Sequence, residues 1–335
     1  MKIVCLPGDG IGPEVTAAAT RVLRAVVPEA DLEERPFGGV AIHSTGEPLP
    51  AETLEACKAA DAVLLGAVGL PEFDGAEVRP EQGLIRLRRA LDVYANLRPA
   101  RANGVDLLIV RELVGGLYYG ARGRRDDGTV YDTCEYHPGE IERVARRAFE
   151  LARSRRQRLT SVDKANVLDT SRLWRRVVSG LAADYPDVEL EHMLADNAGL
   201  QLVVTPARFD VIVTENTFGD ILSDVAAGVT GGLGLAGSAS LGDHAPGLFE
   251  PVHGSAPDIA GRGIANPAGM LRSVALMLAH GVAHAEQAGA LDAAVDAALT
   301  AAPTPDVGGD ATTDRFTDAV LEALGVDAAA DSARR

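Results

Sequence analysis

Short runs of apolar residues alternate along the chain with longer stretches in which apolar residues recur every three or four positions. The runs predict buried strands, and the periodic stretches predict amphipathic helices. The predicted strands are 3–6, 62–65, 106–110, 160–162, 188–193 and 209–214, and the predicted helices are 13–27, 52–60, 82–91, 139–156, 171–184, 216–227 (with a loop at its start) and 268–288. Because continuous apolar strands alternating with helices are typical of parallel sheets, the pattern predicts an α/β protein with a mainly parallel sheet.

Two further segments have no strong periodicity. The segment 228–242 is rich in glycine, alanine and serine, and we interpret it as a crossing or a hinge. The tail after Val326 is polar and is expected to fray.

The first predicted strand runs into the glycine-rich turn PGDGIGP. A strand, a glycine turn and a helix N-terminus can hold a pyrophosphate in a Rossmann fold, and the acidic residues Asp31, Glu33 and Glu34 follow about 20 residues later, where the ribose-binding acid would lie. The spacing, however, is G-x-G-x-G, and the next glycine of the Rossmann motif would fall on Pro13, which has no N–H. The turn alone leaves a Rossmann loop and a plain strand-to-helix turn open.

Composition and charge narrow the class of protein. The chain has 335 residues, of which 47% are hydrophobic, and a formal net charge of −16. The length suggests two domains, and the acidic balance argues against non-specific nucleic-acid binding. No apolar run approaches the roughly 20 residues of a membrane span, and no signal-peptide pattern is visible. With the widely spaced cysteines Cys5, Cys57 and Cys134, these features predict a cytoplasmic protein in a reducing compartment.

Two aspartates one helical turn apart are the first sign of chemistry. Asp220 and Asp224, in FGDILSD, share one helix face and repel each other, and a hard divalent cation would offset that repulsion. They follow a predicted strand, where open α/β sheets bind ligands. Lys164, in SVDKANVLD, also follows a strand, and a partly desolvated lysine near a metal can act as a base.

Arginines and a phenol would bind and protonate an anionic substrate. Arg88, Arg98 and Arg111 suit a substrate with two carboxylates, because a guanidinium matches a carboxylate in a bidentate way. In VRELVGGLYYG a pair of glycines precedes Tyr118 and Tyr119, and a phenol beside a metal and a lysine could donate a proton.

The segment EPVHGSAPDIAGRGIANP, residues 250–267, is long for an unstructured loop, and such loops commonly close over ligands. Asp258 could accept hydrogen bonds from both hydroxyls of an adenosine ribose, and it would repel a 2′-phosphate.

Taken in order, these motifs resemble one family, the β-decarboxylating dehydrogenases, which include the isocitrate and isopropylmalate dehydrogenases. The motifs are PGDGIGPEV, GLIRLRRALDVYANLRP, VRELVGGLYYG, VDKANVL, FGDILSD and FEPVHGSAPDIAGRGIANP. The resemblance implies an isocitrate/isopropylmalate dehydrogenase-like α/β fold that binds its nicotinamide cofactor without a Rossmann fold. It also implies two discontinuous domains that share a mainly parallel sheet. Residues 1–93 and 231–335 would bind the cofactor, and residues 94–230 would carry the dimer interface and an arm at 120–136.

The resemblance also implies an activity, the NAD-dependent oxidative decarboxylation of 3-isopropylmalate to 4-methyl-2-oxopentanoate in leucine biosynthesis. Asp220 and Asp224 would bind Mg²⁺ or Mn²⁺ together with Asp196 of the partner subunit in a homodimer with shared active sites. The metal would polarise the C2 hydroxyl, the partner's Lys164 would take its proton, and Tyr118 would protonate the enolate carbon.

Binding roles follow from the same resemblance. Arg88, Arg98 and Arg111, with Asp220, would bind the malate core. The expected cofactor-binding residues, among which Asp258 would favour NAD over NADP, are Ile11, Glu250, His253, Gly254, Ser255, Ala256, Asp258, Ile259 and Asn266.

Substrate choice depends on the third group of the malate. The predicted helix at 82–91 and the residues beside it carry Glu81, Leu84 and Ile85, and Val167 follows Lys164. This mainly apolar surface resembles that of isopropylmalate enzymes, and burying an isopropyl group would contribute roughly 1.5–3 kcal/mol.

The chain departs from the family pattern in three places. Only PARANG separates Arg98 from Val105, where the family usually has a longer segment, and Val114 and Glu215 are unusual. Another 3-alkylmalate, D-malate or tartrate therefore stays open as the substrate, whereas the apolar surface disfavours homoisocitrate. The alternatives from other classes are a non-catalytic nucleotide-binding subunit and a metal-dependent hydrolase.

Overall fold

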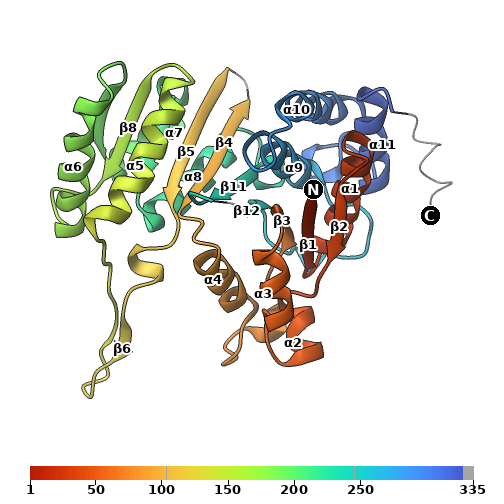
Figure 1. Ribbon diagram of the computed structural model, residues 1–335, viewed down its shortest axis with the longest axis horizontal. Helices are drawn as coiled ribbons and strands as arrows, with labels where there is room; N and C mark the ends of the chain where they lie inside the picture. Colours follow the sequence, from red (N-terminus) through yellow and green to blue (C-terminus); the bar gives the residue numbers. More distant parts are fainter. Residues whose placement is uncertain (103, 245, 327–335) are drawn as a thin grey trace. The chain divides into compact units, whose positions relative to one another are not determined.

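The computed structural model describes residues 1–102, 104–244 and 246–326 (Figure 1). The tail predicted to fray lies outside the described residues. The chain divides into two compact units, one formed by Met1–Asp92 and Leu233–Arg335 and the other by Val93–Gly232. The roles predicted for the two domains stay predictions.

The first unit contains a mostly parallel sheet. Its strands are β1 (Lys2–Gly8), β2 (Asp31–Glu34), β3 (Ala62–Ala67), β11 (Gly237–Leu241) and β12 (Gly247–Pro251). They lie in the order β2-β1-β3-β12-β11, and only β11 runs antiparallel to its neighbour β12. Every residue of β3 is buried, as expected of a continuous apolar strand inside an α/β layer.

The helices of the first unit are α1 (Gly12–Val26), α2 (Gly39–Thr45), α3 (Ala51–Lys58), α4 (Pro80–Ala90), α9 (Ala268–His280), α10 (Ala285–Ala301) and α11 (Thr313–Ala323). Both α1 and α9 pack on the strands and on each other. Helix α1 begins with Gly12 and Pro13, and a proline in the first helical turn costs no hydrogen bond.

The second unit also contains a mostly parallel sheet. Its strands are β4 (Ala95–Ala102), β5 (Val105–Glu112), β8 (Arg158–Asp163), β9 (Glu189–Leu194) and β10 (Val211–Thr214). They lie in the order β4-β5-β10-β8-β9, with only the β4–β5 pair antiparallel.

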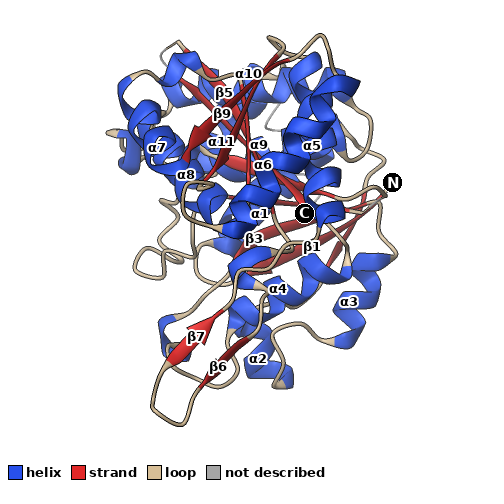
Figure 2. Ribbon diagram, turned by 90° about the vertical axis from the view of Figure 1, so that its left-hand side faces the viewer, coloured by secondary structure: helices blue, strands red, loops and turns tan. Residues whose placement is uncertain are grey.

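The helices of the second unit are α5 (Pro138–Arg153), α6 (Asp169–Leu181), α7 (Ala195–Val204) and α8 (Asn216–Val229). Helix α5 packs against α6, and α7 packs against α8. Figure 1 shows α5 in front of the sheet and α8 behind it. A small antiparallel hairpin of β6 (Arg122–Arg124) and β7 (Val130–Asp132) extends away from this sheet in the predicted arm (Figure 2).

The structure corrects two sequence-based predictions, on a long helix and on Arg111, and adds a strand to a third segment. The predicted helix 268–288 is interrupted between α9 and α10, where Ala283 has a φ of +59° and a side chain at Gly281 would meet the Phe249 ring. The segment 228–242, interpreted as a crossing or hinge, does contain the point at which the chain leaves the second unit and re-enters the first, between Gly232 and Leu233, and it also contains strand β11, which pairs with β12. Arg111 was expected after its strand but lies within β5. Among the described residues, no helix has both the length and the apolar character needed to cross a bilayer.

Candidate active site

The strands of the second unit place several predicted residues at one edge of the sheet. Strands β5, β10 and β8 are parallel neighbours, with Thr214 beside both Arg111 and Val162. Their carboxyl ends therefore share the edge where α/β sheets bind ligands. Arg111 lies near the end of β5, α8 begins directly after β10, and Lys164 follows β8.

Asp220 is the centre of a charged cluster at this edge. One oxygen of its carboxylate accepts a hydrogen bond from Arg111 Nη1 and lies 3.4 Å from Arg98 Nη2. The other oxygen accepts a hydrogen bond from the Tyr118 hydroxyl at 3.0 Å. The structure thus brings Arg98, Arg111 and Tyr118 to one predicted metal ligand.

The second predicted metal ligand, Asp224, shares this cluster. Arg98 Nη1 lies 3.3 Å from its Oδ1 and also donates to Ser223 Oγ at 2.8 Å, while Arg98 Nε donates to Asn96 Oδ1 at 2.7 Å. The arginines therefore offset the repulsion between Asp220 and Asp224 that the sequence predicts. Two guanidinium groups and two carboxylates give the cluster a balanced formal charge.

Burial and mutual charge tune the groups of the cluster. Burial raises the pKa of Tyr118, and the Asp220 carboxylate raises it further, so the phenol stays protonated. Burial also raises the pKa of Asp224, with Arg98 opposing and Asp220 adding to the shift. The site therefore combines a protonated phenol with fixed cations.

The remaining predicted residues of this unit, Lys164 and Asp196, form a pair. Lys164 Nζ donates to Asp196 Oδ1 at 2.5 Å, and the Asp196 carboxylate is mostly exposed. The hydrogen bond from Lys164 lowers the pKa of Asp196. Val167 closes the turn after Lys164, because its N–H donates to Lys164 O, and its side chain is exposed.

The chemistry of the aspartates fits a divalent cation. Asp220 and Asp224 stand one helical turn apart on α8 and supply the hard carboxylate oxygens that Mg²⁺ and Mn²⁺ prefer. Within the described part of the chain, no third carboxylate, histidine or cysteine joins them to form a cluster. A third protein ligand would have to come from elsewhere, as the prediction for Asp196 of the partner subunit requires.

In the first unit, the glycine-rich turn is tied to the loop predicted to bind the cofactor. The Ile11 N–H donates to Ser255 O at 2.8 Å. A Cβ on Gly10 would lie only 2.0 Å from Ser255 O, so only glycine permits this approach, and its φ of +58° favours glycine as well. The turn PGDGIGP therefore holds the cofactor loop through its backbone.

Asp9 anchors the same region and was missed by sequence reasoning. Its carboxylate is fully buried and accepts hydrogen bonds from the N–H groups of Gly39 (2.9 Å), Val40 (3.1 Å) and Gly69 (2.9 Å). The signal available in the sequence was an acidic residue directly after an apolar strand. Polar residues are common inside glycine turns, so the position of Asp9 in the sequence did not indicate which backbone groups its carboxylate would bind.

The other predicted cofactor residues differ in their burial and in their hydrogen bonds to the rest of the protein. Asn266 is buried, its amide donates to Asp306 at 3.1 Å and its oxygen accepts from Ala268 N at 3.0 Å. Gly254 and Asp258 are exposed, whereas Ala256 and Ile259 are half-buried.

One orphaned atom makes the loop suited to a polar ligand. The His253 Nδ1–H donates to Gly254 O at 2.9 Å, but the buried Nε2 of the ring has no hydrogen-bond partner among the described residues. Burial lowers the pKa of His253, which favours the neutral ring. Together with the exposed Asp258 carboxylate, these groups fit a dinucleotide.

The remaining predicted substrate residues of the first unit lie on α4. Arg88 Nη2 donates to Glu250 Oε1 at 2.6 Å, so a predicted substrate residue is bonded to a predicted cofactor residue. Glu81 and Ile85 are exposed, and Leu84 is half-buried.

These features define a member of an enzyme family. The chain matches the family described as isocitrate/isopropylmalate dehydrogenase over residues 2–320, and it belongs to that family. The family and the fold class predicted from the sequence are both confirmed.

Relatives named 3-isopropylmalate dehydrogenase are similar over most of the chain. The protein from Prochlorococcus marinus (strain MIT 9313) is 53% identical over 87% of this chain and 88% of its own length. The protein from Deinococcus radiodurans is 53% identical over 97% of this chain and 98% of its own length.

Solved structures share the fold. The isocitrate dehydrogenase from Methylococcus capsulatus has a TM-score of 0.90 and 38% identity, covering 96% of this chain and 99% of that one. The beta-decarboxylating dehydrogenase from Thermococcus kodakarensis has a TM-score of 0.82 and 38% identity, covering 97% of this chain and 96% of that one.

Proposed function

We propose that this chain catalyses the NAD-dependent, divalent-metal-dependent oxidative decarboxylation of 3-isopropylmalate to 4-methyl-2-oxopentanoate, a step of leucine biosynthesis. The observation that carries the proposal is the cluster of Arg98, Arg111, Tyr118, Asp220 and Asp224 at one sheet edge. The relatives named for this activity, at 53% identity over most of the chain, support it. Members of this family use NAD(P) and a divalent metal.

The charge balance of the cluster suits a metal and a dicarboxylate that bind together. Arg98 and Arg111 are paired with Asp220 and Asp224 in the structure. A divalent cation on the aspartates would free the guanidinium groups, and a substrate with two carboxylates would then take them up. The cluster stays balanced in both arrangements. Arg88, bonded to Glu250 in the structure, is the third proposed carboxylate ligand.

The chain's own side chains move the protons. Lys164 accepts the proton of the C2 hydroxyl as hydride leaves C2, and Tyr118, whose raised pKa keeps it protonated, donates a proton to the enolate carbon after CO₂ is lost. Asp220, Asp224 and Asp196 of the partner subunit would hold Mg²⁺ or Mn²⁺, which would supply polarisation of the C2 oxygen, and NAD would be the hydride acceptor.

The cofactor loop is proposed to select NAD. The Asp258 carboxylate is exposed on this loop and is free to accept from both ribose hydroxyls, while a 2′-phosphate would be repelled. The buried His253 Nε2 and the nearby Ile11, Gly254, Ser255, Ala256 and Ile259 are the other proposed contacts, with Glu250 and Asn266 holding the loop ends.

Apolar side chains are proposed to receive the isopropyl group. The residues proposed for this role are Glu81, Leu84 and Ile85 of α4 and, in the other unit, the exposed Val167.

The active enzyme is proposed to be a homodimer with shared active sites. Large apolar side chains are exposed on α7 and α8, with exposed fractions of 57% for Leu200, 61% for Val203, 63% for Val204 and 57% for Ile221. Such a patch on two adjacent helices is typical of a protein interface. The Lys164–Asp196 pair would then serve the other subunit's site.

A substrate panel tests the proposal. The purified protein is assayed for NADH or NADPH formation with 3-isopropylmalate, D-malate, tartrate, isocitrate and homoisocitrate, each with Mg²⁺ and with chelator. Turnover of 3-isopropylmalate with NAD that is lost with chelator supports the proposal. Preferred turnover of another acid would reassign the substrate, and the shortened segment after Arg98 would be the first feature to test as the cause of the altered specificity. No turnover of any acid by the metal-loaded dimer would favour a non-catalytic role.

A further inference from the structure

Tyr136 joins three segments of the second unit through its hydroxyl group. The hydroxyl donates to Glu112 Oε2 at 3.0 Å and accepts from the Asn216 N–H at 3.0 Å. Its ring meets the Trp174 ring edge-on, with the centroids 5.9 Å apart. The tyrosine follows the arm hairpin and was not among the residues singled out by the sequence.

The Tyr136 ring also supports the turn that leads to Tyr118. A Cβ on Gly115 would lie 2.8 Å from Tyr136 Cε1, and a Cβ on Gly116 would lie 2.5 Å from the Tyr136 hydroxyl. The backbone of both glycines is thus pressed against the ring. Glu112 holds the turn from the other side, because its carboxylate accepts from Val114 N at 2.9 Å and Gly115 N at 3.0 Å.

Asn216 links Tyr136 to Arg111, because it bonds to both. Its oxygen accepts from Arg111 Nε at 2.9 Å and Nη2 at 2.7 Å, and its amide donates to Leu113 O at 3.2 Å and Gly115 O at 2.9 Å. Asn216 and Arg111 are both buried. The first residue of α8 therefore fixes the guanidinium and the turn together.

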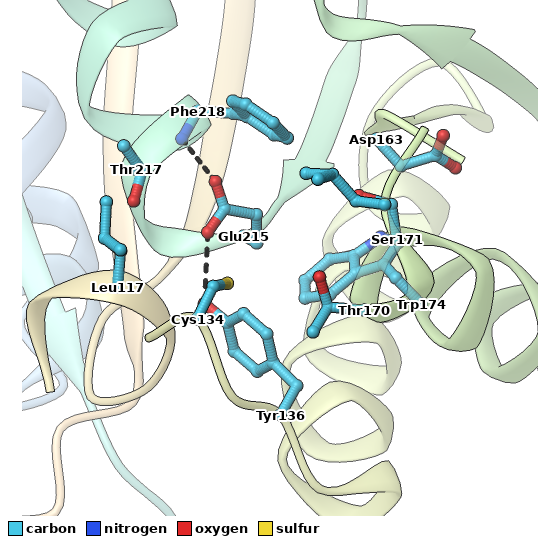
Figure 3. Close-up of a pocket in the computed structure, with 11 residues that line it drawn as sticks. Leu117, Cys134, Tyr136, Asp163, Thr170, Ser171, Trp174, Glu215, Thr217 and Phe218 are labelled. Atoms are coloured by element: carbon cyan, nitrogen blue, oxygen red, sulfur yellow. Dashed lines mark hydrogen bonds between the residues drawn. The ribbon is translucent and has the colours of Figure 1, made fainter. Parts of the chain in front are cut away.

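A second carboxylate lies beside the Tyr136 hydroxyl. Glu215 Oε2 is 3.5 Å away, and its other oxygen accepts from the Phe218 N–H at the start of α8 (Figure 3). Tyr136 and Glu215 line a cavity of about 250 Å³ together with Cys134 and Trp174. Burial raises the pKa of Tyr136, so the hydroxyl keeps its proton between the two carboxyl groups.

We propose that Tyr136 is a positioning residue for the reaction, which holds Tyr118 and Arg111 at Asp220 through the turn at Gly115 and Gly116 and through Asn216. This proposal rests on the proposed function for the roles of Tyr118 and Arg111. Tyr136 itself is not proposed to touch substrate or cofactor.

The test is Tyr136→Phe, which removes the hydroxyl and keeps the ring. Turnover of 3-isopropylmalate is measured together with the enzyme-catalysed exchange of the C3 protons of 4-methyl-2-oxopentanoate in D₂O, a step that needs Tyr118 without net hydride transfer. We expect kcat and the exchange rate to fall in parallel by about 10- to 100-fold, because a small misplacement of catalytic groups has such an effect. The KM for NAD should not change, since the proposed NAD residues lie in the first unit.

Tyr185→Phe is the matched control. Tyr185 is buried, its ring stacks on Phe149 with centroids 4.6 Å apart, and its hydroxyl bonds to the Arg146 side chain. We expect Tyr185→Phe to lower the thermal stability about as much as Tyr136→Phe does but to leave kcat unchanged. Wild-type kcat and exchange in the Tyr136→Phe variant, or an equal kinetic loss in Tyr185→Phe, would overturn the proposal.

A substrate-independent measurement separates this proposal from the proposed function. Solvent exchange of the Arg111 Nε–H is followed by ¹⁵N NMR, with the signal assigned by Arg111→Lys. We expect Tyr136→Phe to speed this exchange at least 10-fold relative to wild type and Tyr185→Phe, and an unchanged rate counts against the positioning role. Inactivity of the wild type on the whole substrate panel would defeat the proposed function, and the NMR result would still decide whether Tyr136 holds Arg111.

Discussion

In the first unit the proposed cofactor residues lie on loops that are held by other groups, whereas in the second unit the proposed catalytic side chains are bonded to one another. The Ile11 N–H ties the predicted cofactor loop to the glycine-rich turn, Asp9 in that turn bonds the backbone at Gly39 and Gly69, and the exposed Asp258 takes no part in that support. In the second unit, Arg111 and Tyr118 hold Asp220 in place through hydrogen bonds, and the same three side chains are the proposed substrate, proton and metal ligands. Support and function can therefore be separated by mutation in the first unit, but they are coupled in the second.

Lys164 is paired with Asp196 and not with the Arg111–Tyr118–Asp220 group, and its replacement should have the largest effect on activity. We expect Lys164→Ala to lower kcat by roughly 10²- to 10⁴-fold, the usual contribution of a general base. NAD binding and the unfolding free energy should change little, because an ion pair whose carboxylate is mostly exposed contributes about 1 kcal/mol or less. Hydride transfer is measured by NADH absorbance, and NAD binding by calorimetry.

The control for that variant is Lys58→Ala, which removes a similar surface pair, Lys58–Glu55 at 3.0 Å, without loss of activity. Near-normal turnover of Lys164→Ala would remove the lysine from the mechanism.

Variants of Asp9 and Asp258 test whether stability and cofactor binding depend on different residues in the first unit. Asp9→Asn places an amide N–H₂ against backbone donors, and we expect the unfolding free energy to fall by about 1–3 kcal/mol. Asp258→Asn should leave stability unchanged and raise the KM for NAD several-fold. Urea unfolding and NAD kinetics of both variants measure the contrast. If Asp9→Asn is as stable as wild type, the buried carboxylate does not support these loops.

The smallest expected effect is a pH dependence from Glu112. Burial raises its pKa from 4.5 to about 7, so between these values the folded protein holds a proton that the unfolded chain releases. The stability that this group contributes is therefore present below about pH 4.5 and is lost as pH rises to about 7. Relative to Glu112→Gln, which cannot titrate, the wild type should lose Tm between pH 5 and pH 8.

Thermal unfolding of both proteins across this range measures the effect of Glu112. The Tm difference between them is the quantity to follow, since the variant also loses hydrogen bonds at every pH. A difference that stays constant would mean that Glu112 is ionised throughout.

Sequence patterns predicted the buried strands well, because strands such as β3 and β5 are continuous apolar runs. They did not predict β4, which is rich in arginine and contains Pro99, or β12, which is short. Strand β4 pairs with the next strand, β5, and β12 pairs with β11 and with the distant β3. Backbone hydrogen bonds hold these strands, and the apolar pattern of a single segment carries no signal of that pairing. Likewise, the break after α9 depends on the Phe249 ring from a distant strand.

The sequence by itself determined the family, the α/β class and the identity of the chemical groups, because residue types and their order are enough to specify carboxylates, guanidinium groups and a phenol. Only the tertiary structure decided which of them meet. Arg98 and Arg111 offset the repulsion between Asp220 and Asp224, where the sequence suggested a metal alone. Asp9 and Tyr136 act through contacts with residues at least 20 positions away, and such contacts arise only when the chain folds and buries their polar groups.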